Sequence, residues 1–95
     1  MKGGMDMKEY RWIVMAENGM HARPAGTLAS SLKSLSSEVR VRCGDKEVDG
    51  KRLLSLMGLG ATRGSELIFT VIGGDEDAAL DVIRRFCREH LDVGV

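Results

Sequence analysis

The run Asn18-Gly19-Met20-His21-Ala22-Arg23-Pro24-Ala25 marks the point where a strand gives way to a helix. The apolar stretch before it, Trp12 to Ala16, is typical of a strand, and Asn-Gly is a strong turn signal. Pro24 is the only proline of the chain, and its fixed φ suits the first turn of a helix. We therefore expect His21 to lie at the mouth of a helix.

A position at the start of a helix favours anion binding beside His21. The first backbone N–H groups of a helix have no partner within the helix, and the helix dipole places roughly half a positive charge there. The amides after His21 and the guanidinium of Arg23 would suit the oxygens of a phosphoryl group carried on the imidazole. The same field disfavours the imidazolium form, so we expect a neutral, nucleophilic side chain. Position alone leaves open the alternative that His21 is an ordinary polar residue at a helix start.

Length and composition predict one compact domain. The chain has 95 residues, of which 43% are hydrophobic and 29% charged. Its net charge is zero and its aromatic content 4%, so Arg40 and Arg42 are interpreted as part of a solvated sheet face, and no nucleic-acid partner is expected. No apolar run approaches the ~20 residues of a membrane span, and Met1 to Asp6 lack the apolar core of a signal peptide. We predict a cytoplasmic protein that does not insert into membranes.

Neither the glycine-rich segment nor the cysteines indicate a cofactor or a metal. The segment Gly58 to Gly64 has one residue more than the dinucleotide-binding pattern and precedes a strand, so we interpret it as a tight turn. Cys43 and Cys87 lack a recognisable metal-binding spacing, and His90 is the only histidine besides His21. We expect reduced, buried thiols, no metal site and no cofactor.

Alternation of apolar and polar residues predicts four strands, at Glu9 to Ala16, Val39 to Cys43, Lys46 to Asp49 and Glu66 to Ile72. The second and third form a hairpin, and the fourth, which is the most hydrophobic, is expected to be central. Asp75 to His90 is predicted to be a helix, because acidic residues open it and basic residues close it. The pattern favours helices on one face of a mainly antiparallel sheet, with the strand order left open.

Two blocks of the sequence resemble one protein family. The run Gly19 to Ala25 is similar to the signature of HPr, the histidine-containing phosphocarrier of the bacterial sugar phosphotransferase system. Gly50 to Gly60, followed by Arg63 to Leu67, resembles the second helix of that family and the start of its last strand. The resemblance extends from about Met7 to about Leu91 with little or no gap, and so covers nearly the whole chain.

The resemblance implies an α+β fold, an open-faced two-layer sandwich in which three helices cover one face of a four-stranded antiparallel sheet. The helices implied are Pro24 to about Leu35, Leu53 to Leu59 and Asp75 to His90. Residues 7–95 would form this single HPr-like domain. Residues 1–6 are expected to be a flexible N-terminal extension, longer than the usual lead before the first strand.

The resemblance also implies a function, a reversible phosphoryl relay. His21 would accept a phosphoryl group through Nδ1 from enzyme I and pass it to a sugar-specific enzyme IIA. Arg23 would be the charge clamp, with Asn18, Gly19, Ala22 and Pro24 as the supporting loop. Such a protein is a phosphorylated intermediate rather than a free-standing enzyme, and we expect it to act as a monomer.

Partner docking is expected beside the histidine loop. The resemblance, together with the apolar character of the short second helix, assigns it to Met20, Arg52, Leu53, Leu54 and Met57, whereas Leu56 is either part of this patch or core. We also expect Arg23, Lys51 and Arg52 to cluster around His21.

Arg52 departs from the family pattern. Many members carry there a serine that an ATP-dependent kinase phosphorylates, so serine regulation of the usual form is not expected in this chain. An alternative function stays open: a regulatory HPr-like module of the nitrogen-related branch, whose phosphorylation state controls partner binding rather than sugar uptake.

Overall fold

The computed structural model describes residues 7–92. The extension predicted for residues 1–6 lies outside this range. Along the chain the elements are β1 (Met7–Ile13), α1 (Ala22–Lys33), β2 (Glu38–Cys43), β3 (Lys46–Asp49), α2 (Leu53–Met57), β4 (Glu66–Ile72) and α3 (Glu76–His90).

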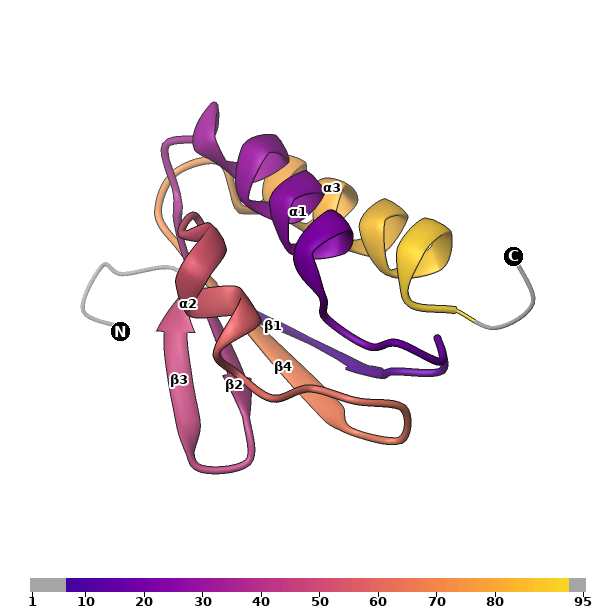
Figure 1. The fold of residues 1–95 in the computed structure, drawn as a ribbon. Helices are drawn as coiled ribbons and strands as arrows, with labels where there is room; N and C mark the ends of the chain where they lie inside the picture. The colour runs from indigo at the N-terminus through magenta and orange to yellow at the C-terminus, as the bar shows by residue number, and fades with distance from the viewer. Residues whose placement is uncertain (1–6, 93–95) are drawn as a thin grey trace.

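The four strands form one antiparallel sheet in the order β1-β4-β2-β3. β4 is central, as predicted, because Phe69 pairs with Tyr10 of β1 on one side and with Val41 of β2 on the other. Figure 1 shows α1 and α3 side by side on one side of the sheet, with α2 at the β3 end. The predicted architecture, four antiparallel strands under three helices, is confirmed.

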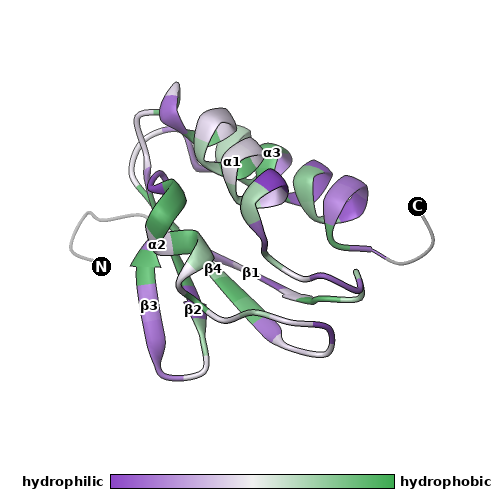
Figure 2. Ribbon diagram, viewed as in Figure 1, coloured by the Kyte–Doolittle hydropathy of each residue, from purple (hydrophilic) through white to green (hydrophobic). Residues whose placement is uncertain are grey.

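The core lies between the sheet and the helices. Leu67, Phe69 and Val71 share the inner face of β4, and all three are fully buried. Burial of such side chains contributes about 1.5–3 kcal/mol each. Leu28 and Leu32 of α1 and Ile83 of α3 close the layer from above. Figure 2 shows hydrophilic residues toward the C-terminal end of α3, a helix whose buried residues lie on one side.

Element ends differ from the prediction where tertiary contacts decide them. β1 ends at Ile13 rather than Ala16, because the N–H groups of Met15 and Ala16 donate to the carbonyl of Leu91 at the end of α3, at 2.8 and 3.1 Å. α1 begins at Ala22, two residues before Pro24, and the shorter α2 ends at Met57.

Gly26 lies inside α1 without a steric reason to be glycine. A Cβ atom placed there would meet only Leu53 Cδ1, at 3.9 Å, which is an ordinary contact. Gly26→Ala is therefore expected to raise the free energy of unfolding by about 0.5–1 kcal/mol, because alanine restricts the unfolded chain and favours helix. Urea unfolding measures this difference.

Gly50→Ala is the matched control for that prediction. A Cβ atom at Gly50 would lie 3.1 Å from Val39 Cγ1 and 3.2 Å from Leu32 Cδ1, so the same substitution is expected to lower stability by overpacking. A lower urea midpoint for Gly26→Ala than for the wild type would contradict our account of α1.

A carboxylate ties the start of α3 to the segment before β2. Asp75 accepts hydrogen bonds from the backbone N–H of Ser36 and Ser37, at 3.0 and 2.9 Å, and from the Ser37 hydroxyl. The Ser37 hydroxyl and then the Ser36 amide lower the pKa of Asp75 from 3.8 to about 2. The ionised form therefore stabilises the fold.

These hydrogen bonds to Asp75, called the Asp75 latch below, predict that the stability of the fold decreases in acid. Since the folded pKa is below the unfolded one, the stabilisation is complete above pH 3.8 and is lost as the pH falls through about 2. Asp75→Asn is expected to lower the melting temperature at neutral pH and to flatten the dependence in acid. Urea unfolding of both chains between about pH 5 and 2 measures it. Asp45→Asn, at an exposed turn residue, controls for loss of a charge, and an equal effect there would refute the latch.

Candidate functional site

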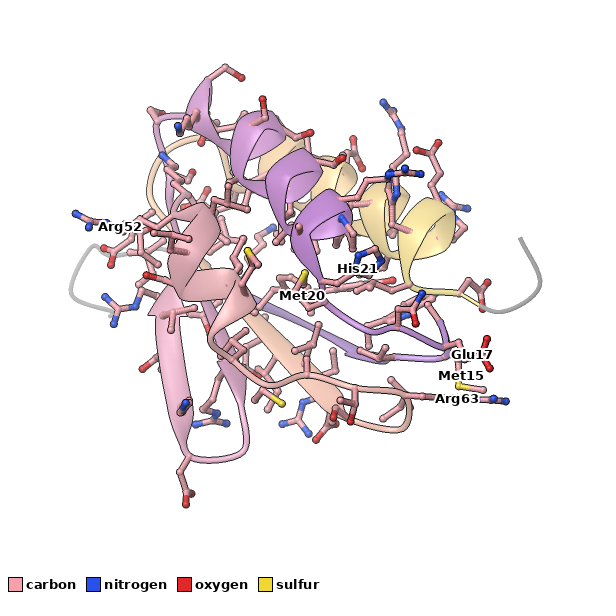
Figure 3. The ribbon with its side chains drawn as sticks, in the orientation of Figure 1. Met15, Glu17, Met20, His21, Arg52 and Arg63 are labelled. Atoms are coloured by element: carbon pink, nitrogen blue, oxygen red, sulfur yellow. The ribbon has the colours of Figure 1, made fainter. Side chains whose placement is uncertain are left out.

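His21 is the N-cap residue of α1. Its backbone is extended, with φ −97° and ψ −168°, and its carbonyl accepts the first helical hydrogen bond, from the N–H of Ala25 at 2.9 Å. Its side chain is exposed and makes no capping hydrogen bond within the described chain. Figure 3 shows it where the loop from β1 turns into α1. The imidazole is therefore free for chemistry.

Two backbone donors lie directly beside it. Over residues 7–92, the N–H groups of Ala22 and Arg23 have no acceptor, and the third helical residue, Pro24, has no N–H at all. The first turn carries no acidic residue, so nothing on the helix neutralises the positive end of its dipole. An anion held on the imidazole would meet two unused donors.

Arg23 supplies a cation two residues from the histidine. It is exposed, and none of the ion pairs found in the described part of the chain involves it. Its guanidinium is therefore not committed to a carboxylate and presents several donors to an oxyanion.

The predicted cluster of Lys51 and Arg52 around His21 is not formed. Lys51 Nζ donates to the carbonyl of Leu35, past the other end of α1, at 2.7 Å. Arg52 Nε lies 3.7 Å from an Asp49 carboxylate oxygen, and Figure 3 shows Arg52 beside α2, away from His21. Lys51 is thus held at the C-terminal end of α1, and Arg52 is paired with a carboxylate in the turn before α2.

An apolar patch is exposed on α2. Leu53, Leu54 and Met57 are 40%, 79% and 41% exposed, whereas Leu56 on the opposite side of the helix is fully buried. Figure 2 shows the helix in strongly hydrophobic colours. Leu53 adjoins Gly26 of α1, so the α2 patch lies beside the helix whose N-cap is His21.

Met20 was expected in this patch, and that expectation is corrected. Its side chain is only 4% exposed and belongs to the core cluster beneath α1. The residue before an exposed histidine is thus an anchor rather than a docking surface.

Sequence reasoning missed the supports of the histidine loop. The turn that follows α2 is hydrogen-bonded to this loop: Met20 N–H donates to the Ala61 carbonyl at 3.1 Å, and Gly64 N–H donates to the Val14 carbonyl at 2.7 Å. On the other side, the Leu91 carbonyl receives the two donors described above. Backbone carbonyls carry no sequence signal, and only the turn itself was predicted, which the Ser65 N–H to Thr62 carbonyl bond of 2.9 Å confirms.

The cysteines lie away from this site and are free. Cys87 is buried, as predicted, and burial raises the pKa of its thiol to about 12. Cys43 is only half-buried, so that prediction is wrong for one of the two: it is the last residue of β2, where the sheet reaches the hairpin turn. Among residues 7–92 no group of three or more metal-binding side chains comes together. No helix in the same range has the length and apolar character to cross a bilayer.

The sequence and the fold both match characterised proteins. The family model described as "PTS HPr component phosphorylation site" matches residues 8–89. The phosphocarrier protein HPr of Lysinibacillus sphaericus is 34% identical over 83 residues, which cover 87% of this chain and 94% of that protein. The structure of the histidine-containing phosphocarrier protein of Mycoplasma superposes with a TM-score of 0.87 at 26% identity, covering 92% of this chain and 100% of that one.

A longer relative contains the same unit. The multiphosphoryl transfer protein of Xanthomonas campestris is 32% identical over 77 residues, but the chain spans only 9% of its length. Through its open-faced α+β fold the chain falls into one class with the histidine-containing phosphocarrier structure, and an exposed histidine stands at the start of its first helix. The match over residues 8–89 is specific within that class: the chain belongs to the HPr phosphocarrier family of the phosphotransferase system.

Proposed function

We propose that His21 accepts a phosphoryl group from the phosphohistidine of enzyme I and passes it to a histidine of a sugar-specific enzyme IIA. One observation carries this proposal. The imidazole of His21, at the start of α1, is exposed, makes no capping hydrogen bond and lies beside two amides that have no acceptor among the described residues. A histidine serving only as a helix cap would use its side chain on those amides.

A domain of this size can carry out the proposed phosphoryl transfer. Nδ1 of neutral His21 attacks the phosphorus, a new N–P bond forms as the donor's N–P bond breaks, and the reverse exchange discharges the carrier. Phosphoryl transfer is promoted mainly by positioning and by stabilising charge on the phosphoryl oxygens. The N–H groups of Ala22 and Arg23 hold these oxygens, and the Arg23 guanidinium adds a full positive charge.

In this proposal, Asn18, Gly19 and Pro24 set the shape of the loop that carries His21. Asn18 and Gly19 belong to the turn before the histidine, which the Gly19 N–H closes by donating to the Ala16 carbonyl at 3.2 Å, with Gly19 in the left-handed region at φ +62°. Pro24 occupies a helical position whose missing N–H leaves no hydrogen bond unmade.

Docking is assigned to the α2 patch of Leu53, Leu54 and Met57, with Arg52 at its rim. Arg52 is 75% exposed despite its contact with Asp49, so it offers positive charge to an acidic partner. A small apolar patch with a charged rim suits a monomeric carrier that must leave each partner quickly.

The test is stepwise phosphorylation. The chain is incubated with phosphoenolpyruvate and enzyme I, and intact mass is measured before and after acid treatment. We expect one acid-labile phosphoryl group, which moves to enzyme IIA when that protein is added. No label refutes the proposal, and a label that no enzyme IIA accepts supports the regulatory alternative, which would use the same histidine.

A further inference from the structure

We propose that Gly19 and Met20 are positioning residues for His21, and that they act through the turn of residues 61–65. This inference rests on the proposed phosphoryl transfer at His21 and says how that side chain is held in place. Residues 14–20 run from β1 to α1 as an irregular segment, so their position must come from contacts elsewhere.

The turn is built to hold its shape. Ser65 N–H donates to the Thr62 carbonyl at 2.9 Å, and Thr62 N–H donates to Ser65 Oγ at 3.1 Å. Val14 N–H donates to the Ser65 carbonyl at 2.8 Å and Gly64 N–H to the Val14 carbonyl at 2.7 Å, so the turn is paired with the end of β1 as well. The turn is therefore a fixed surface against which the histidine loop rests.

Met20 fastens the loop to this surface immediately before His21. Its N–H donates to the Ala61 carbonyl at 3.1 Å, while its side chain, 4% exposed, is packed into the core. A backbone bond and a buried side chain on the same residue fix where the next residue starts. Figure 3 shows Met20 beneath α1 and His21 at the N-terminal end of the same helix.

Gly19 allows the close approach. A Cβ atom placed there would overlap with the Ala61 carbonyl oxygen and lie 2.8 Å from Thr62 Cα, both backbone atoms of the turn. To restore a normal contact the loop would move by about 1 Å. A misplacement of about 1 Å at a reacting group can reduce the rate about 100-fold.

The other end of the segment is held independently. Leu91 receives hydrogen bonds from Met15 and Ala16 through its carbonyl, and its side chain is fully buried. A substitution at Gly19 therefore cannot be absorbed by shifting the whole segment, and the displacement reaches His21.

Gly44→Ala is the matched control for Gly19→Ala. Both glycines have φ +62°, so alanine pays the same backbone strain at each, but a Cβ atom at Gly44 would meet nothing within 4 Å. We expect Gly19→Ala to lower kcat for phosphorylation by enzyme I about 10- to 100-fold. KM is expected to change less than about twofold, because the α2 patch is untouched. Gly44→Ala is expected to keep both constants near wild type.

A second pair covers the case in which Gly19→Ala does not fold, as judged by the absence of a cooperative melt. Met20→Ala removes the buried anchor, and Met20→Leu restores a side chain of similar volume. We expect kcat to fall for the first variant and to recover for the second. Wild-type kcat in a folded Gly19→Ala variant, a rise in KM alone, or equal kcat for the two Met20 variants would overturn the inference.

A separate experiment distinguishes failure of this inference from failure of the proposed function. Phosphoramidate phosphorylates histidine without any partner protein, and the hydrolysis rate of the phosphohistidine reports how well the amides and Arg23 hold the group. We expect faster hydrolysis in Gly19→Ala than in Gly44→Ala, by about two- to tenfold, a range set by the strength of one hydrogen bond. If enzyme I fails to label even the wild type, the carrier role is refuted while this comparison still tests the positioning role.

Discussion

A chain with glutamine in place of His21 is expected to take no phosphoryl group from enzyme I, with a rate at least about 1,000-fold below wild type. Glutamine keeps a polar side chain of similar reach but has no nucleophilic nitrogen. The fold is expected to survive, because the His21 side chain makes no hydrogen bond within the described structure that the substitution could break. Intact mass after incubation with phosphoenolpyruvate and enzyme I measures the loss.

His90→Gln is the control for this variant. His90 is half-buried at the end of α3 and stacks on Phe86 with 5.2 Å between ring centroids, so it serves packing rather than chemistry. We expect this variant to be labelled like wild type. Equal labelling of His21→Gln and wild type would remove the basis of the carrier mechanism.

Arg23→Ala is expected to reduce kcat for phosphorylation about 100- to 1,000-fold, the loss typical of one preorganised donor to a developing oxyanion. Arg23→Lys keeps the charge but loses the planar pair of donors, so its loss is expected to be smaller. Rapid-quench measurement of the first turnover separates this effect from docking.

Arg42→Ala controls for removing a cation. Arg42 lies on β2 opposite Ile68, on the sheet face that no helix covers, and is exposed. We expect its phosphorylation to be unchanged. If Arg23→Ala is as active as Arg42→Ala, the clamp assigned to Arg23 is wrong.

The sheet was predictable from the sequence because its signals are local. The bounds of β3 and β4 match the prediction, since alternating side chains and flanking glycines mark both strands. The ends of β1 and α1 do not match. A proline is tolerated throughout the first helical turn, so Pro24 gave no sharp start, and Leu91 diverts the chain after Ile13 through a contact between distant residues.

The candidate site, like the sheet, was predictable only in part. The position of His21 and Arg23 at a helix start was predictable, because the Asn-Gly turn and Pro24 mark that start, while their chemical roles stay predictions. Met20 and Lys51 were misplaced, because hydrophobicity and charge do not say which acceptor or cavity a long side chain will reach. A turn was predicted in this region, but its support of the histidine loop was not, since that support is the backbone oxygen of Ala61 and the close approach that Gly19 allows.

The open start of α1 also sets how much energy the loaded carrier can retain. Whatever stabilises the phosphorylated form relative to the free one must be returned when the group leaves, because the two states are thermodynamically linked. In the proposed carrier, an exposed histidine, two amides and an exposed arginine would hold the group by screened, solvent-accessible interactions, which are individually weak. We therefore expect the phosphorylated form of the proposed carrier to keep most of its transfer potential, and the relay to run in both directions.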